Sequence, residues 1–207
     1  MPFSVSMLHM KNFEGGHGEF QGWLPPRKAK FMKQLIAVLR RAAPLGVSVG
    51  LLKSDLDLLL TKEQQKKVSA YGLCAVHAIG SMMHWVKKKG SSEPIACVFE
   101  AGDEGAGRIT DGINHARKKS AEFDKRLLSF GFEKKPNMWG LEAADFLAYE
   151  AAKHLPKKAG LDPKPPRQSL LRLLKRTPEH ISIHLDTEVL RNPLFGLTDA
   201  LGDGQTE

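Results

Sequence analysis

Two long segments of the chain carry apolar residues at the spacing of a helix that packs on one face. Between 27 and 43 these residues recur every three or four positions, and Pro44 then ends the pattern. The stretch 140–155 (GLEAADFLAYEAAKHL) shows the same period. Shorter helices are expected over 109–120 and near 170–174. These segments predict the helical part of the fold.

Strand patterns lie between the predicted helices. Short apolar runs at 45–52 and 95–99 have the length of buried strands, and a weaker strand is expected over 126–132. Apolar and polar residues alternate at 3–8 and at 180–185, which is typical of half-buried strands. Because strands and helices alternate along the chain, the sequence favours an α/β sandwich with helices packed on a mixed sheet.

Turn and cap residues predict how these elements begin and end. The Gly-rich stretch 9–23 reads as a loop. Ser54 or Asp55 can cap a short helix after the second predicted strand. Thr61 and Gln64 have the spacing of a capping box, which predicts a long helical stretch to about position 89. Gly72 and Gly80 are places within it where a break can occur.

A basic, Pro-rich stretch at 156–166 (PKKAGLDPKPP) indicates a linker. The expected organisation is therefore one α/β domain over 1–155, followed by an appendage over 156–207 that contains a small helix and a strand. No internal repeat is found in the sequence.

Composition places the chain among globular proteins. It has 207 residues, of which 42% are hydrophobic and 26% charged, and this balance argues against wholesale disorder or a fibrous repeat. Two cysteines provide no disulfide framework and no close metal pair. No apolar run reaches the roughly 18–20 residues of a membrane span, and the first residues lack the pattern of a signal peptide. We expect a soluble, cytoplasmic protein without membrane contact.

The net charge of +8 is unevenly distributed along the sequence. The segment Lys153 to Arg176 holds eight basic residues and one acid, and 27–41 holds no acid at all. By contrast, 93–111 holds five acids against Arg108. Clustered Lys and Arg attract polyanions, and grouped carboxylates can hold a cation, so the pattern fits a nucleic-acid surface beside an acidic centre. Solvated helix faces with scattered acids are the alternative that charge alone leaves open.

Two carboxylates have informative positions. Asp145 borders the apolar stripe of its predicted helix, where an ionised group needs a metal ion, a buried base or a backbone donor as partner. Glu100 follows a buried strand, at the edge of a sheet where ligands bind, and Asp103 and Glu104 come shortly after it. The alternatives are a first-turn acid for Asp145, a solvated strand end for Glu100, and an acidic turn or helix N-cap for the other two.

Four segments, taken in order, resemble a known family. They are HMKNFE at 9–14, GEFQGW at 18–23, VFE at 98–100 and LEAADFLAYE at 141–150. Together they are similar to the bacterial and phage family called domain of unknown function 3800, over about 8–155. The family's closing motif reads approximately L-Q-A-A-D-x-L-A-Y-E, and Glu142 here replaces the usual Gln.

The resemblance implies an RNase H-like three-layer sandwich with an acidic metal site. Members usually open with a strand that bears an Asp-Glu-Ser motif, and no such string precedes position 9, so an N-terminally truncated sheet is expected. Either the gene start was set too late, or the protein lacks this strand and one catalytic carboxylate. Carried over by position, Glu100 and Asp145 would be catalytic ligands of Mg²⁺ or Mn²⁺, with Asp103 and Glu104 as auxiliary ligands.

The sequence thus leads to two hypotheses of function. The first is a metal-dependent phosphodiester hydrolase, or its inactive remnant, that holds nucleic acid with the basic segment after the last long helix. The residues expected to contact nucleic acid are Lys153, Lys157, Lys158, Lys164 and Arg167. The second is a non-catalytic module that keeps the fold and binds nucleic acid or protein. Protein partners are not identified by the sequence.

Overall fold

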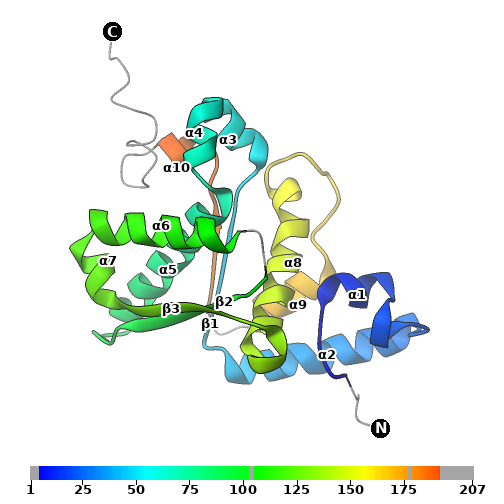
Figure 1. Ribbon diagram of the computed structural model, residues 1–207. Coiled ribbons are helices and arrows are strands. Elements are labelled where there is room, and N and C mark those ends of the chain that lie inside the picture. The colour runs from blue at the N-terminus through cyan, green and yellow to red at the C-terminus, as the bar shows by residue number, and fades with distance from the viewer. Residues whose placement is uncertain (1–4, 103–104, 177–178, 192–207) are drawn as a thin grey trace. The chain divides into compact units, whose positions relative to one another are not determined.

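The computed structural model describes residues 5–102, 105–176 and 179–191 (Figure 1). The chain divides into two compact units. Unit 1 comprises Met1–Ser48 and Glu133–Ile181, and unit 2 comprises Val49–Phe132 and Ser182–Glu207. The expected boundary between 155 and 156 lies inside a helix of unit 1. No helix in the described part of the chain combines the length and hydropathy needed to cross a membrane.

Unit 1 is largely helical. Its elements are α1 (Met10–Gly15), η1 (Gly18–Phe20), α2 (Pro25–Ala42), η2 (Lys135–Asn137), α8 (Gly140–Lys158) and α9 (Gln168–Arg176). The predicted helix over 27–43 is confirmed as α2, which buries Met32 and Ile36 in the core. Phe146 of α8 and Leu173 of α9 belong to the same core. Helix α9 packs on α2, so the segment after 156 is part of this unit.

The N-terminal segment differs from the prediction. The described part of the expected strand at 3–8 is not a strand, and the expected loop over 9–23 contains α1 and η1. Met10 and Phe13 lie three residues apart on α1 and are both buried. The centroid of the Phe13 ring lies 5.2 Å from that of the Phe20 ring. Gly16 ends α1 with a φ of 69°, the left-handed conformation that favours glycine. Contacts with the core therefore stabilise a helix too short for its own sequence to indicate.

Unit 2 contains α3 (Lys53–Leu59), α4 (Lys62–Lys67), α5 (Ala70–Lys88), β2 (Ile95–Glu100), α6 (Ala106–Lys119), α7 (Ala121–Arg126), β3 (Leu127–Glu133) and α10 (Thr187–Arg191), with β3 ending at the boundary with unit 1. The capping box at Thr61 is confirmed, but the helix it opens ends at Lys67. A new helix begins at Ala70, capped by Ser69, so the break precedes both Gly72 and Gly80. Neither Ser54 nor Asp55 caps α3, whose N-cap is Leu52.

Helices α5 and α6 pack closely because glycines face each other where they meet. A methyl group on Gly112 of α6 would lie 3.0 Å from the Cα of Gly72 on α5. One on Gly72 would lie 2.8 Å from the Arg108 carbonyl oxygen. Both positions therefore require glycine, because a side chain at either one would push the two helix backbones apart.

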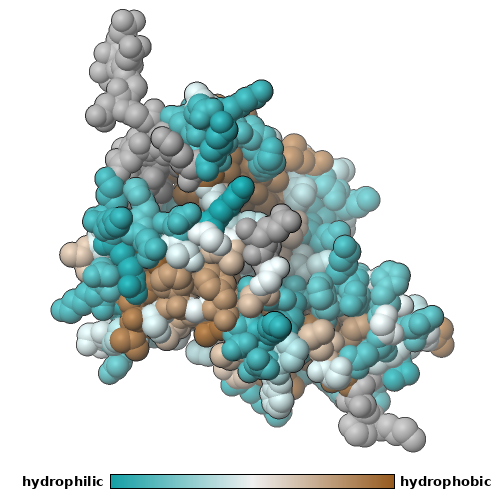
Figure 2. All heavy atoms as spheres, viewed as in Figure 1, coloured by the Kyte–Doolittle hydropathy of each residue, from teal (hydrophilic) through white to brown (hydrophobic). Residues whose placement is uncertain are grey.

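The fold class is α/β, as expected, but the described strands form two small parallel pairs rather than one mixed sheet. Strand β1 (Leu45–Gly50) pairs with β4 (Glu179–His184), and β2 pairs with β3. The first pair runs through the boundary between the units. Val98 of β2 and Leu128 of β3 are exposed, and Figure 2 shows apolar residues gathered over the region where Figure 1 draws these two strands.

The last long helix extends further than its sequence indicates. Helix α8 continues through Pro156 to Lys158, although the prediction ended it at 155 and began a linker at the proline. Proline lacks the N–H of a helical hydrogen bond, and α8 ends two residues after it. The predicted short helix near 170–174 and the strand near 180–185 are confirmed as α9 and β4.

Candidate functional site

Asp145 lies on α8 next to buried Phe146, and 22% of its side chain is exposed. Its Oδ2 accepts the N–H of Met10, the first residue of α1, at 3.0 Å. The Lys135 Nζ lies 3.3 Å from the same oxygen, and only 4% of the lysine side chain is exposed. This carboxylate is therefore compensated by a backbone donor and a buried base. These are two of the three kinds of partner that its helical position was expected to require.

A histidine completes this cluster. The Nδ1 of His9 lies 3.9 Å from Asp145 Oδ2, is shielded from solvent and has no hydrogen-bond partner among the described residues. The rest of the imidazole is partly exposed. The cluster thus presents a carboxylate, an ammonium and an imidazole at the junction of α1, η2 and α8.

These residues alone make a poor divalent-cation site. Mg²⁺ and Mn²⁺ prefer several oxygen ligands, whereas Asp145 is a single carboxylate whose Oδ2 already has an ammonium and an N–H beside it. Within the described residues, no three His, Cys, Asp or Glu side chains are grouped to hold a metal ion. Glu100 is the exposed last residue of β2 in unit 2, whereas Asp145 belongs to unit 1. Asp103 and Glu104 lie outside the described residues.

A second charged network binds α9 to α1 and α8. Glu150 of α8 is fully buried, and its Oε1 accepts the Ser169 hydroxyl at 2.9 Å. The Arg167 Nε lies 3.6 Å from the Glu150 Oε2, and the same guanidinium donates to Glu14 of α1. Burial raises the pKa of the Glu150 carboxyl, and the hydrogen bond from Ser169 and the charge of Arg167 offset only part of this rise. Arg167 is therefore engaged inside unit 1.

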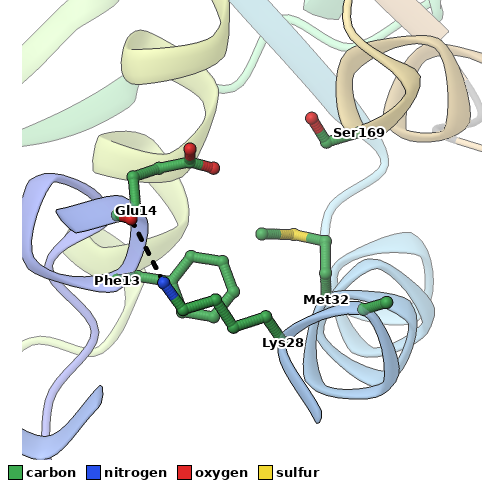
Figure 3. A pocket seen from close by; sticks show the side chains of 6 residues that line it. Phe13, Glu14, Lys28, Met32 and Ser169 are labelled. Carbon is green, nitrogen blue, oxygen red and sulfur yellow. Dashed lines mark hydrogen bonds between the residues drawn. The ribbon is translucent and has the colours of Figure 1, made fainter. Parts of the chain in front are cut away.

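A small open hollow of about 190 Å³ lies beside this network (Figure 3). Its lining residues are Phe13, Glu14, Lys28, Ala29, Met32 and Ser169. Figure 3 shows Lys28 extending past the Phe13 ring, and its Nζ donates to the Glu14 carbonyl oxygen at 3.1 Å. Substrate pockets usually enclose about 300–1,000 Å³. Because the hollow is smaller and its charged groups bind the protein itself, we do not assign it a ligand.

The lysines expected to contact nucleic acid have different surroundings. Lys153, Lys158 and Lys164 are exposed, and the Lys153 Nζ lies 5.6 Å from the centre of the Tyr149 ring. The Lys157 Nζ instead donates to the Pro165 carbonyl oxygen at 2.6 Å. Three of the five basic candidates thus present their charge to solvent, and all five belong to unit 1.

The two units differ sharply in charge. Unit 1 holds 17 Lys and Arg against 8 Asp and Glu, whereas unit 2 holds 14 against 15. The whole positive excess of the chain therefore belongs to unit 1, which brings together the two basic segments seen in the sequence. This separation is the property of the molecule that most clearly points to a polyanionic ligand.

Sequence reasoning missed several members of these clusters. Buried Lys135 follows exposed Lys134, and nothing in the string KKP distinguishes them. Glu150 had a usable signal, because it lies four residues after buried Phe146 on the same helical stripe. His9 had none beyond its place in the first segment of the family resemblance.

No protein-family model matches this chain, and neither a curated protein nor a solved structure matches it significantly. The resemblance to domain of unknown function 3800 therefore stays a prediction.

Proposed function

We propose that the protein is a nucleic-acid-binding module that contacts the phosphate backbone through unit 1. The observation that carries this proposal is the division of charge, with a net +9 in unit 1 and −1 in unit 2. Lysine and arginine that neutralise phosphates release bound counterions, which supplies most of the free energy of non-specific binding. Trp139 adds a largely exposed aromatic surface in the same unit, which suits stacking on an unpaired base.

Fluorescence anisotropy with labelled single-stranded and duplex DNA and RNA tests this function. We expect dissociation constants of roughly 10⁻⁴–10⁻⁶ M near physiological salt, with little dependence on base sequence. Affinity should fall about a hundredfold between about 50 and 200 mM salt. Binding that is unaffected by salt, or no binding at the lowest salt, would refute the proposal.

A second candidate is metal-dependent phosphodiester hydrolysis within an RNase H-like sandwich. The observation in its favour is a partly exposed carboxylate, Asp145, held beside His9 and Lys135 in the basic unit. This candidate ranks second because Lys135 and the Met10 N–H already compensate that carboxylate.

Incubation of the same oligonucleotides with protein and Mg²⁺ or Mn²⁺ separates the two candidates. The hydrolase predicts cleavage that Glu100→Gln and Asp145→Asn both abolish. The binding module predicts intact oligonucleotide at every metal concentration. Cleavage that survives both substitutions would exclude these residues as the catalytic pair.

A further inference from the structure

One face of α2 carries exposed basic residues along its whole length. They are Arg27, Lys30, Lys33, Arg40 and Arg41. At about 100° per residue they fall within about 140° of the helix circumference. No acidic residue lies between 27 and 41. The opposite face buries Met32 and Ile36 in the core of unit 1, so packing fixes which side of the helix faces solvent.

The charges on this face are not used inside the protein. Within the described residues, no ion pair or hydrogen bond engages the charged groups of Lys30, Lys33, Arg40 or Arg41. The guanidinium of Arg27 lies 4.1 Å from the centre of the Trp23 ring. This cation–π contact orients the guanidinium but leaves its positive charge in place.

Several exposed lysines in unit 2 behave differently. Lys53 pairs with Asp57 at 3.2 Å, and Lys87 pairs with Glu122 at 3.0 Å. Such surface pairs reduce the field that a polyanion would meet. Helix α2 differs from these sites because it holds no acidic residue that could pair with its basic ones.

The geometry points to α2 as the surface that binds the phosphate backbone of nucleic acid. This inference rests on the proposed function and locates it. From Arg27 to Arg41 the helix rises about 21 Å, at about 1.5 Å per residue. One strand of a B-form duplex advances about 3.4 Å along the duplex axis per phosphate, so the length of the face matches the axial rise of roughly six phosphates. All five basic residues belong to one continuous helix.

An anionic membrane fits this helix less well. A helix that lies in a membrane surface inserts its apolar face among the lipids, and the apolar face of α2 is already buried in the core. Within α2, which the structure describes completely, Val38 is the large apolar side chain that is mostly exposed, at 61%. The face therefore offers charge for phosphates but little apolar surface for insertion.

The test compares two variants of the full chain with equal loss of charge. The α2 variant carries Lys30→Gln, Lys33→Gln, Arg40→Gln and Arg41→Gln. The matched control carries Lys62→Gln, Lys88→Gln, Lys118→Gln and Lys125→Gln, which are exposed helical lysines of unit 2. The probes are a labelled oligothymidylate long enough to span α2, the corresponding duplex, and vesicles that contain phosphatidylserine. Circular dichroism and thermal melting confirm that both variants keep the wild-type fold.

We expect the α2 variant to bind at least tenfold more weakly than the control at about 0.1 M salt. For the single strand, the slope of log Kd against log salt concentration should be smaller for this variant than for wild type by about three, because each phosphate contact contributes about 0.7 to the slope. A variant with Lys30→Arg and Lys33→Arg should bind like wild type, since it keeps both charges.

Three results would overturn the inference. Equal losses in the α2 variant and the control would show that total charge matters and α2 does not, while the proposed function would stand. Absence of salt-dependent binding by the wild type would overturn both this inference and the proposed function. Binding to vesicles without binding to either oligonucleotide would assign the face to membranes.

Discussion

At the scale of single residues, the described part of unit 1 places its buried charged side chains beside partners of opposite charge. Lys135 lies beside Asp145, and Glu150 lies between Arg167 and Ser169. Each group joins segments that are far apart in sequence, since Met10 contacts Asp145 and Glu14 contacts Arg167. The need for a partner at Asp145 could be predicted from its helical position. Its identity could not, because burial of a lysine depends on the segments that pack over it.

Replacement of Lys135 by methionine tests the first of these groups. The change leaves the Asp145 carboxylate without its buried ammonium, so Lys135→Met should destabilise the fold by about 2 kcal/mol, below the roughly 3–5 typical of fully buried pairs because Asp145 is partly solvated. Urea denaturation measures this difference, with Lys134→Met as the exposed control. Adding Asp145→Asn should recover part of the loss. Equal stability of the Lys135 and Lys134 variants would contradict this account of the pair.

The buried carboxyl of Glu150 predicts a pH dependence with a defined sign. Its raised pKa means that the folded chain holds this proton more tightly than the unfolded chain, whose carboxyl keeps the ordinary value of 4.5. The stability from this group is therefore complete below 4.5 and is lost as the pH rises through the folded pKa. The free energy of unfolding of wild type relative to Glu150→Gln should fall as the pH rises above 4.5. If the stability of wild type relative to Glu150→Gln rises with pH instead, the ion pair with Arg167 outweighs the effect of burial on the Glu150 carboxyl.

At the scale of elements, local signals predicted some helix ends well and others not at all. Thr61 accepts the Gln64 N–H while Gln64 accepts the Thr61 N–H at 2.8 Å, as the capping-box spacing indicated. Ser54, an equally good cap residue by type, caps nothing in the described structure. Helix α1 had no local signal, because it depends on aromatic contacts with the core. A helix cap depends on neighbouring residues and can be predicted from the sequence, whereas a short helix forms only when tertiary packing stabilises it.

The contact between α5 and α6 gives a sharp comparison between two glycines of one helix. Gly112→Ala places a methyl group 3.0 Å from the Gly72 backbone, which cannot move independently, and should cost about 1–3 kcal/mol. Gly107→Ala meets open space on the same helix and should stabilise the protein by about 0.5–1 kcal/mol through helix propensity. Thermal and urea denaturation measure both. Similar effects of the two substitutions would show that α5 and α6 are further apart than described.

At the scale of the whole molecule, the sequence predicted the α/β class and most of the long elements. It could not predict two units that each combine separate stretches of chain, because local periodicity carries no information about which distant segments pack together. The charge maxima were visible in the sequence. Their collection into one unit became visible only with the fold, and this collection supports binding of a polyanion more directly than any single carboxylate supports catalysis.

The central claim is that unit 1 carries the nucleic-acid surface, and lysine footprinting tests it most directly. The wild-type protein is acetylated with and without a saturating oligonucleotide at low salt, and mass spectrometry reads each lysine. The account predicts that Lys30, Lys33 and Lys158 are protected, while Lys62 and Lys118 of unit 2 react as in the free protein. Protection spread equally over both units, or confined to unit 2, would contradict it.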